Sequence, residues 1–165
     1  MADDAVRYLA IYMNDHLAGS TIGVELLRRA VGEYEGTPLG TFLAGLRTEV
    51  EQDRETLKAF MAANGVEQQR VKVTAAWAAE KVGRLKFNGA LLRRSPLTPF
   101  VELETLAFGI HGKELLWRAL REIAPDEATA ASLDILIARA QRQHDDVERH
   151  RLEAGAGAIM PARAP

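Results

Sequence analysis

Apolar residues recur at alternating intervals of three and four residues along five stretches of the chain. In the first stretch Val6, Met13, Leu17 and Val24 belong to this series, and the last stretch continues it from Leu133. A mean spacing near 3.5 residues is typical of helices that turn one apolar stripe toward their neighbours in a bundle. No stretch alternates with the period of two that a half-buried strand shows. The pattern predicts an all-α fold.

Proline, glycine and capping residues divide this pattern into separate helices. Thr37-Pro38 and Thr98-Pro99 each combine a capping hydroxyl with a proline at the first helical position, where its missing N–H costs nothing. Gly36 is a typical helix end. The predicted helices cover residues 4–35, 38–64, 71–94, 98–123 and 125–154.

The connections predict how these helices are arranged. The first two helices and the last two are joined by short turns, so each pair forms an antiparallel hairpin. The helix over 71–94 rises about 35 Å, which returns the chain along the bundle and makes 38–64 run parallel to 98–123. Two hairpins joined by a long helical crossover is the ferritin-like arrangement. We predict one domain over residues 1–154 and a flexible Gly/Ala/Pro-rich tail over 155–165.

Composition narrows the classes of function. The chain has 165 residues, 21 of them Lys or Arg and 23 Asp or Glu, and a net charge of −2, which disfavours a nucleic-acid partner bound through bulk charge. It has no Cys, which excludes a disulfide scaffold and a Cys nucleophile and suits a reducing compartment. No apolar run approaches the ~18 residues of a transmembrane helix, and the N-terminus lacks a secretory signal. We therefore predict a cytoplasmic protein without a transmembrane segment.

Charge is concentrated in one predicted helix. Residues 70–94 hold seven basic residues and one acidic residue. We interpret this basic patch as a face that lies across acidic neighbouring helices or a second subunit, with an acidic protein or a membrane surface as the alternative partner. The patch consists of Lys81, Arg84, Lys86, Arg93 and Arg94.

Three segments carry a resemblance to a known family. They are YLAIYMNDHLAGSTIGVELLRRA, LRTEVEQDRETLKAFMAANG and RQHDDVERHR. With them the chain resembles the ferritin-like superfamily over about residues 5–152, in particular its small bacterial stress-associated branch, the YciF type. The resemblance implies a four-helix bundle. It also implies a candidate di-iron or di-manganese carboxylate site, because many members of that superfamily hold one.

A di-metal site of this kind needs Glu-x-x-His on two helices, since that spacing puts both ligands on one helix face. No Glu of this chain has a His three residues later, and only the reversed pairs His111…Glu114 and His150…Glu153 occur. Counting residues from the turns places Leu136 and Ile137 at the middle of the bundle, where a Glu and a His are needed. The sequence therefore predicts no catalytic residues and no resident cofactor, with a divalent metal ion as the alternative.

One charged residue falls within an apolar stripe. Asp53 occupies the stripe of its helix, and a buried charge is costly unless it is paired. Counting residues from the turns also places His16, Ser20 and Lys113 at the same level of the bundle as Asp53. We predict a buried polar layer made of these four residues, which would fix the register of the helices.

Three functions remain open. The missing metal motif favours a non-catalytic, stress-associated binding or structural module, not an enzyme, that forms a homodimer. One alternative is a small-molecule or lipid-binding bundle with a cavity between helices. In a ligand-binding bundle, Gly109 and Gly112 would form a notch beside His111 and Lys113. In a bundle without a ligand, the same glycines would let two helices approach closely. The other alternative is a metalloprotein for iron, manganese or zinc with an unorthodox ligand set: His16, Glu49, Asp53, Glu104, His111, Glu114, His144 and Glu148.

Overall fold

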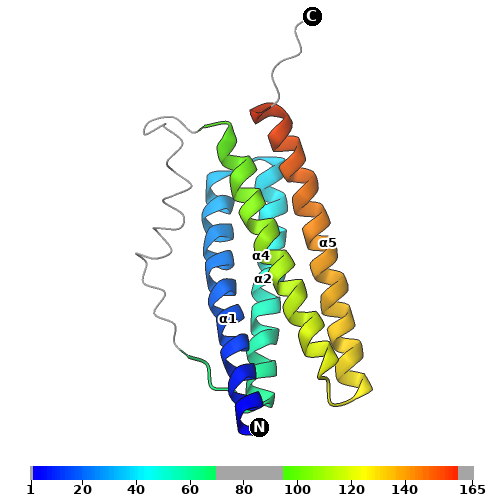
Figure 1. The fold of residues 1–165 in the computed structure, drawn as a ribbon. Helices are drawn as coiled ribbons and strands as arrows, with labels where there is room; N and C mark the ends of the chain where they lie inside the picture. Colours follow the sequence, from blue (N-terminus) through cyan, green and yellow to red (C-terminus); the bar gives the residue numbers. More distant parts are fainter. Residues whose placement is uncertain (1, 70–94, 160–165) are drawn as a thin grey trace, which may run out of the picture.

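The computed structural model describes residues 2–69 and 95–159. These residues form four α-helices and no strand: α1 (Ala2–Glu33), α2 (Pro38–Ala63), α4 (Leu97–Glu122) and α5 (Glu127–Ala158). The predicted all-α fold class is confirmed. In Figure 1, α1 and α2 run antiparallel, α4 and α5 run antiparallel, and α2 points in the same direction as α4. The helix expected over 71–94, with its basic patch from Lys81 to Arg94, lies outside the described residues.

Two turns position the hairpins. Thr37 is the N-cap of α2, as predicted, and its hydroxyl accepts a hydrogen bond of 3.1 Å from the backbone N–H of Gly40. Gly36 has a φ of 75°, a backbone conformation that glycine adopts without a Cβ clash. At the second turn the Asp126 carboxylate accepts a 2.7 Å hydrogen bond from the Thr129 N–H, so α5 begins at Glu127 and not at 125 as predicted.

The predicted cap at Thr98 is wrong. The helix α4 begins one residue earlier, at Leu97, and Pro96 is its N-cap residue without a side-chain cap bond. The hydroxyl of Ser95 accepts a 3.2 Å hydrogen bond from the Leu97 N–H. Ser95 and Pro96 form the same hydroxyl–proline pair as Thr98 and Pro99, three residues earlier. The helix begins after this earlier pair.

The last helix ends later than predicted. The helix α5 continues through Gly155 to Ala158, so residues 155–158 belong to the bundle. Gly155 is buried, and a Cβ there would lie 2.7 Å from Cε2 of Phe100 on α4. This glycine serves close packing between two helices and does not end the helix.

The core consists of two apolar clusters along the bundle axis. One cluster surrounds Met13, Leu57 and Trp117, and the other surrounds Leu27 and Leu43. Burial of such residues is the main contribution to stability in a bundle of this size. No helix within 2–69 and 95–159 has an apolar stretch that could cross a membrane.

Candidate functional site

A buried ion pair separates the two apolar clusters. Asp53 on α2 has a side chain that is 1% exposed. Its Oδ2 lies 2.5 Å from Nζ of Lys113 on α4, and its Oδ1 lies 3.0 Å from Nη1 of Arg139 on α5. Lys113 also donates a hydrogen bond to Oε1 of Gln143 on α5. Three helices are thereby joined at one depth, and two cations neutralise the buried carboxylate.

A second carboxylate extends this layer toward the surface. Nε2 of Gln143 donates a 2.8 Å hydrogen bond to Oε2 of Glu49, and Arg142 pairs with the same carboxylate at 2.9 Å. We call this set the polar layer: Glu49, Asp53, Lys113, Arg139, Arg142 and Gln143. It holds two carboxylates and three basic side chains. Burial lowers the pKa of Lys113, although the neighbouring Asp53 favours its charged form.

The polar layer differs in part from the one expected from the sequence. The structure brings Asp53 and Lys113 together. Ser20 instead donates a 2.7 Å hydrogen bond to the carbonyl of Leu17 in its own helix, and the ring of His16 packs edge-on against Tyr12 with 4.6 Å between centroids. Ser20 and His16 therefore lie beside the layer and not in it.

Sequence reasoning missed Arg139 and Gln143, because it placed Leu136 and Ile137 at this depth. Helical side chains lean toward the N-terminus of their helix. In an antiparallel hairpin this direction points away from the turn in the first helix and toward the turn in the second. The residue of the second helix that meets a given side chain of the first therefore lies farther from the turn than a count of backbone positions indicates. Gln143 does occupy the apolar stripe of its helix. A polar residue at a position where the pattern expects an apolar one is the signal from which Gln143 could have been identified.

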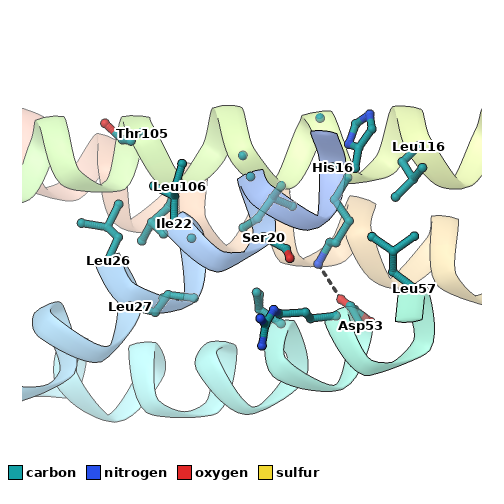
Figure 2. A pocket seen from close by; sticks show the side chains of 18 of the residues that line it. His16, Ser20, Ile22, Leu26, Leu27, Asp53, Leu57, Thr105, Leu106 and Leu116 are labelled. Carbon is teal, nitrogen blue, oxygen red and sulfur yellow. Dashed lines mark hydrogen bonds and ion pairs between the residues drawn. The ribbon is translucent and has the colours of Figure 1, made fainter. Parts of the chain in front are cut away.

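A groove of about 430 Å³ opens beside the polar layer, between α1 and α4, with α2 as its floor (Figure 2). Its walls are mostly apolar and include Ile22, Leu26 and Leu106. Lys113 and Asp53 both line it. The groove thus combines an apolar surface with one charged, hydrogen-bonding region, the usual composition of a small-molecule site.

Four glycines make room for this groove. Within the described residues, no heavy atom outside the local backbone lies within 4 Å of a Cβ placed on any of them. The expectation that Gly109 and Gly112 let helices approach closely is therefore wrong for the described part of the chain. The alternative, a notch at these glycines, agrees with the structure for Lys113, while His111 is not among the residues that line the groove. The absence of side chains at these positions leaves open space between α1 and α4. The four are Gly19, Gly23, Gly109 and Gly112.

Three residues with hydrogen-bond donors are among those that line the same groove: Arg54, Lys113 and Trp117. Trp117 is 1% exposed, and its indole Nε1 has no hydrogen-bond partner among the described residues. The Nε of Arg54 likewise has none. A lysine ammonium has three N–H donors, and Asp53 and Gln143 take two of those on Lys113. The nitrogens of Trp117 and Arg54 are themselves buried, so a molecule in the groove would reach them only if neighbouring side chains shifted.

His16 lies on α1 where that helix lines the groove. Burial lowers its pKa, and the opposing influence of Asp15 is smaller. We expect an NMR titration to give His16 a midpoint below 6.5, the value of a free histidine side chain. Because the unfolded chain then binds the proton more readily, His16 makes the fold less stable as the pH falls through 6.5.

The His16→Asn variant assigns the resonance, since its signal disappears. It is also expected to lose less stability than the wild type between neutral pH and pH 5.5. A midpoint at or above 6.5 would contradict this prediction.

The eight candidate metal ligands do not form one cluster. Within 2–69 and 95–159 no group of three or more His, Cys, Asp or Glu side chains could hold a metal ion. His111 lies beside Glu114, with 3.5 Å between Nδ1 and Oε2, and its ring centroid is 6.0 Å from that of His144. Each candidate carboxylate has a basic partner instead: Asp53 has Lys113, Glu49 has Arg142, Glu114 has Arg118, and Glu104 and Glu148 have Arg151.

Comparisons with protein-family models, curated proteins and solved structures give no match for this chain. The fold and the site therefore define the class of protein. It is a helical bundle with a polar layer across its middle and an apolar groove that opens onto that layer.

Proposed function

We propose that this protein is a non-catalytic helical bundle that binds a small, largely apolar molecule in the groove between α1 and α4. The observation that carries the proposal is the groove itself, whose volume of about 430 Å³ lies within the range of small-molecule sites. Its apolar walls supply the driving force for binding, because a bound molecule removes apolar surface from water. The charged region around Lys113 supplies orientation.

We also infer that the scaffold is a ferritin-like variant that has replaced a metal centre with ion pairs. Ferritin-like proteins hold their metals between the helices at the middle of the bundle. Here that position holds Asp53 with Lys113 and Arg139, and these cations neutralise the carboxylate that a metal would otherwise require. The parallel directions of α2 and α4 support this inference. Homodimer formation, the cytoplasmic location and the stress association stay predictions from the sequence.

A neutral fluorescent probe tests the binding function. We expect N-phenyl-1-naphthylamine to bind the full-length protein and to gain fluorescence as it leaves water. The Gly23→Leu variant is expected to weaken this binding by about tenfold or more, because its side chain extends into the open groove. Leucine also favours a helix more than glycine does, so the variant is expected to fold.

Gly45→Leu is the matched control. Gly45 is a helical glycine of α2 with nothing within 4 Å of its Cβ position, and it does not line the groove. This variant should bind the probe as the wild type does. Failure of the wild type to bind would contradict the proposed function, and equal binding by Gly23→Leu would exclude this groove as the site.

A further inference from the structure

We propose that the molecule bound in the groove is uncharged and has a single extended hydrocarbon chain, as a long-chain alcohol has. This inference rests on the proposed function and specifies the chemistry of the ligand. Two features of the site carry it: the charges that line the groove cancel, and the groove is long and narrow.

The charged side chains that line the groove balance one another. Among the described lining residues, Asp15 and Asp53 oppose Arg54 and Lys113. Asp53 and Lys113 pair directly, with 2.5 Å between Oδ2 and Nζ. Burial lowers the pKa of His16, so that side chain adds no positive charge at pH 7.5. An ion placed against apolar walls is costly unless it is paired, and the groove offers a ligand no net charge of either sign to pair with.

The hydroxyl groups of the groove are also satisfied within the protein. Ser20 donates a 2.7 Å hydrogen bond to the carbonyl of Leu17, and Thr105 donates one of 2.9 Å to the carbonyl of Val101. Both bonds lie within a single helix, so neither donor requires an acceptor on a ligand. The groove therefore selects a molecule mainly by its apolar surface, whose burial drives binding.

The groove is elongated along the bundle. Its lining residues extend from Asp15 to Leu27 on α1 and from Thr105 to Trp117 on α4, and each span is about 18 Å long at the helical rise of 1.5 Å per residue. Figure 2 shows Leu26 and Leu116 toward opposite ends of this length. A molecule that fills the groove is therefore extended parallel to the helices.

The groove is also narrow. A volume of about 430 Å³ over a length of about 18 Å leaves a mean cross-section of about 24 Å², or a width of about 5 Å. Because carbon atoms that are not bonded lie about 4 Å apart when in contact, one hydrocarbon chain fits across this width and two side by side do not.

Competition between alcohols of increasing length tests the extended chain. Octanol, decanol and dodecanol are titrated below their solubility limits, at pH 7.5, against the full-length protein loaded with N-phenyl-1-naphthylamine. We expect the affinity to rise about fourfold for each added methylene, the gain typical of a buried CH₂ group. The isomer of dodecanol with two shorter branches, 2-butyl-1-octanol, is expected to bind at least tenfold more weakly than dodecanol, because its branch does not fit the width.

Charged analogues of the same length test the preference for an uncharged molecule. Dodecanoate and dodecylamine, used below their aggregation concentrations, are each expected to displace the probe about tenfold less strongly than dodecanol. The reason is that neither ion gains a counter-charge to offset its loss of hydration.

A substitution in the middle of the groove locates the chain. Gly112 lines the wall of α4 near the midpoint of its span, and nothing lies within 4 Å of its Cβ position. We expect Gly112→Leu to remove most of the gain in affinity from octanol to dodecanol, because its side chain shortens the free length. Gly45→Leu, on α2 and outside the groove, is the matched control and should keep the full dependence on chain length.

The outcomes separate this inference from the proposed function. If the probe binds but dodecanoate or dodecylamine competes as well as dodecanol, the uncharged ligand is excluded and the groove remains a binding site. If the branched isomer competes as well as dodecanol, or Gly112→Leu keeps the full dependence on chain length, the single extended chain is excluded. If the probe does not bind at all, both proposals are overturned.

Discussion

Asp53→Ala is expected to lower the free energy of unfolding by about 3–5 kcal/mol, a large part of the stability of a domain of this size. The variant leaves Lys113 and Arg139 without the carboxylate that neutralises them. The Lys113 side chain is largely buried, so water only partly replaces the lost carboxylate. Urea denaturation followed by circular dichroism measures the loss.

A double variant shows whether the loss comes from the unpaired charge. Asp53→Leu combined with Lys113→Met replaces the pair with apolar side chains, and Arg139 is exposed enough to turn toward water. We expect the double variant to recover most of the lost stability. Glu55→Ala, which removes an exposed partner of Lys58, is the control and should have little effect. A double variant less stable than Asp53→Ala would refute the explanation.

The polar layer shows how much of the candidate site can be predicted from the sequence pattern. Asp53 and Lys113 are polar residues in apolar stripes, and the need to pair a buried charge is enough to link them from the sequence alone. Arg139 lies outside the stripe of its helix and reaches Asp53 only because its side chain is long. Its part in the layer depends on the directions of side chains in three dimensions, which a count of positions does not give.

The sequence left the groove as one of two alternatives, because the same residues permit two structures. Gly109 and Gly112, with Gly19 and Gly23 opposite, are compatible with helices in close contact and with helices that leave a gap. The separation of α1 from α4 decides between these, and it is set by the packing of each hairpin. Gly155 shows the other case, since it lies against Phe100 where two helices do meet closely.

The polar layer serves the fold and the proposed site together. Its hydrogen bonds join α2, α4 and α5, and α1 completes the groove without a direct bond to Asp53 among the described residues. A change in the position of α1 would therefore alter the width of the groove while the layer stays intact. This arrangement suits a bundle that accepts ligands of different size between α1 and α4.

Gly40→Ala is the second substitution expected to have a large effect, at the turn that orients α1. A Cβ at residue 40 would lie 2.0 Å from the backbone oxygen of Tyr34 and 2.7 Å from its carbonyl carbon. That oxygen also accepts hydrogen bonds from the N–H and the hydroxyl of Thr37, at 3.1 Å and 2.7 Å, so the turn cannot move away without breaking its two bonds to the N-cap residue of α2.

We expect Gly40→Ala to lower the free energy of unfolding by about 3 kcal/mol, measured by urea denaturation, because the clash outweighs the better helix propensity of alanine. Gly45→Ala is the matched control in the same helix, where a Cβ meets open space. That variant should gain about 1 kcal/mol of stability from helix propensity alone. Equal stability of the two variants would show that the turn yields, and the orientation of α1 would then not depend on the contact between Gly40 and Tyr34.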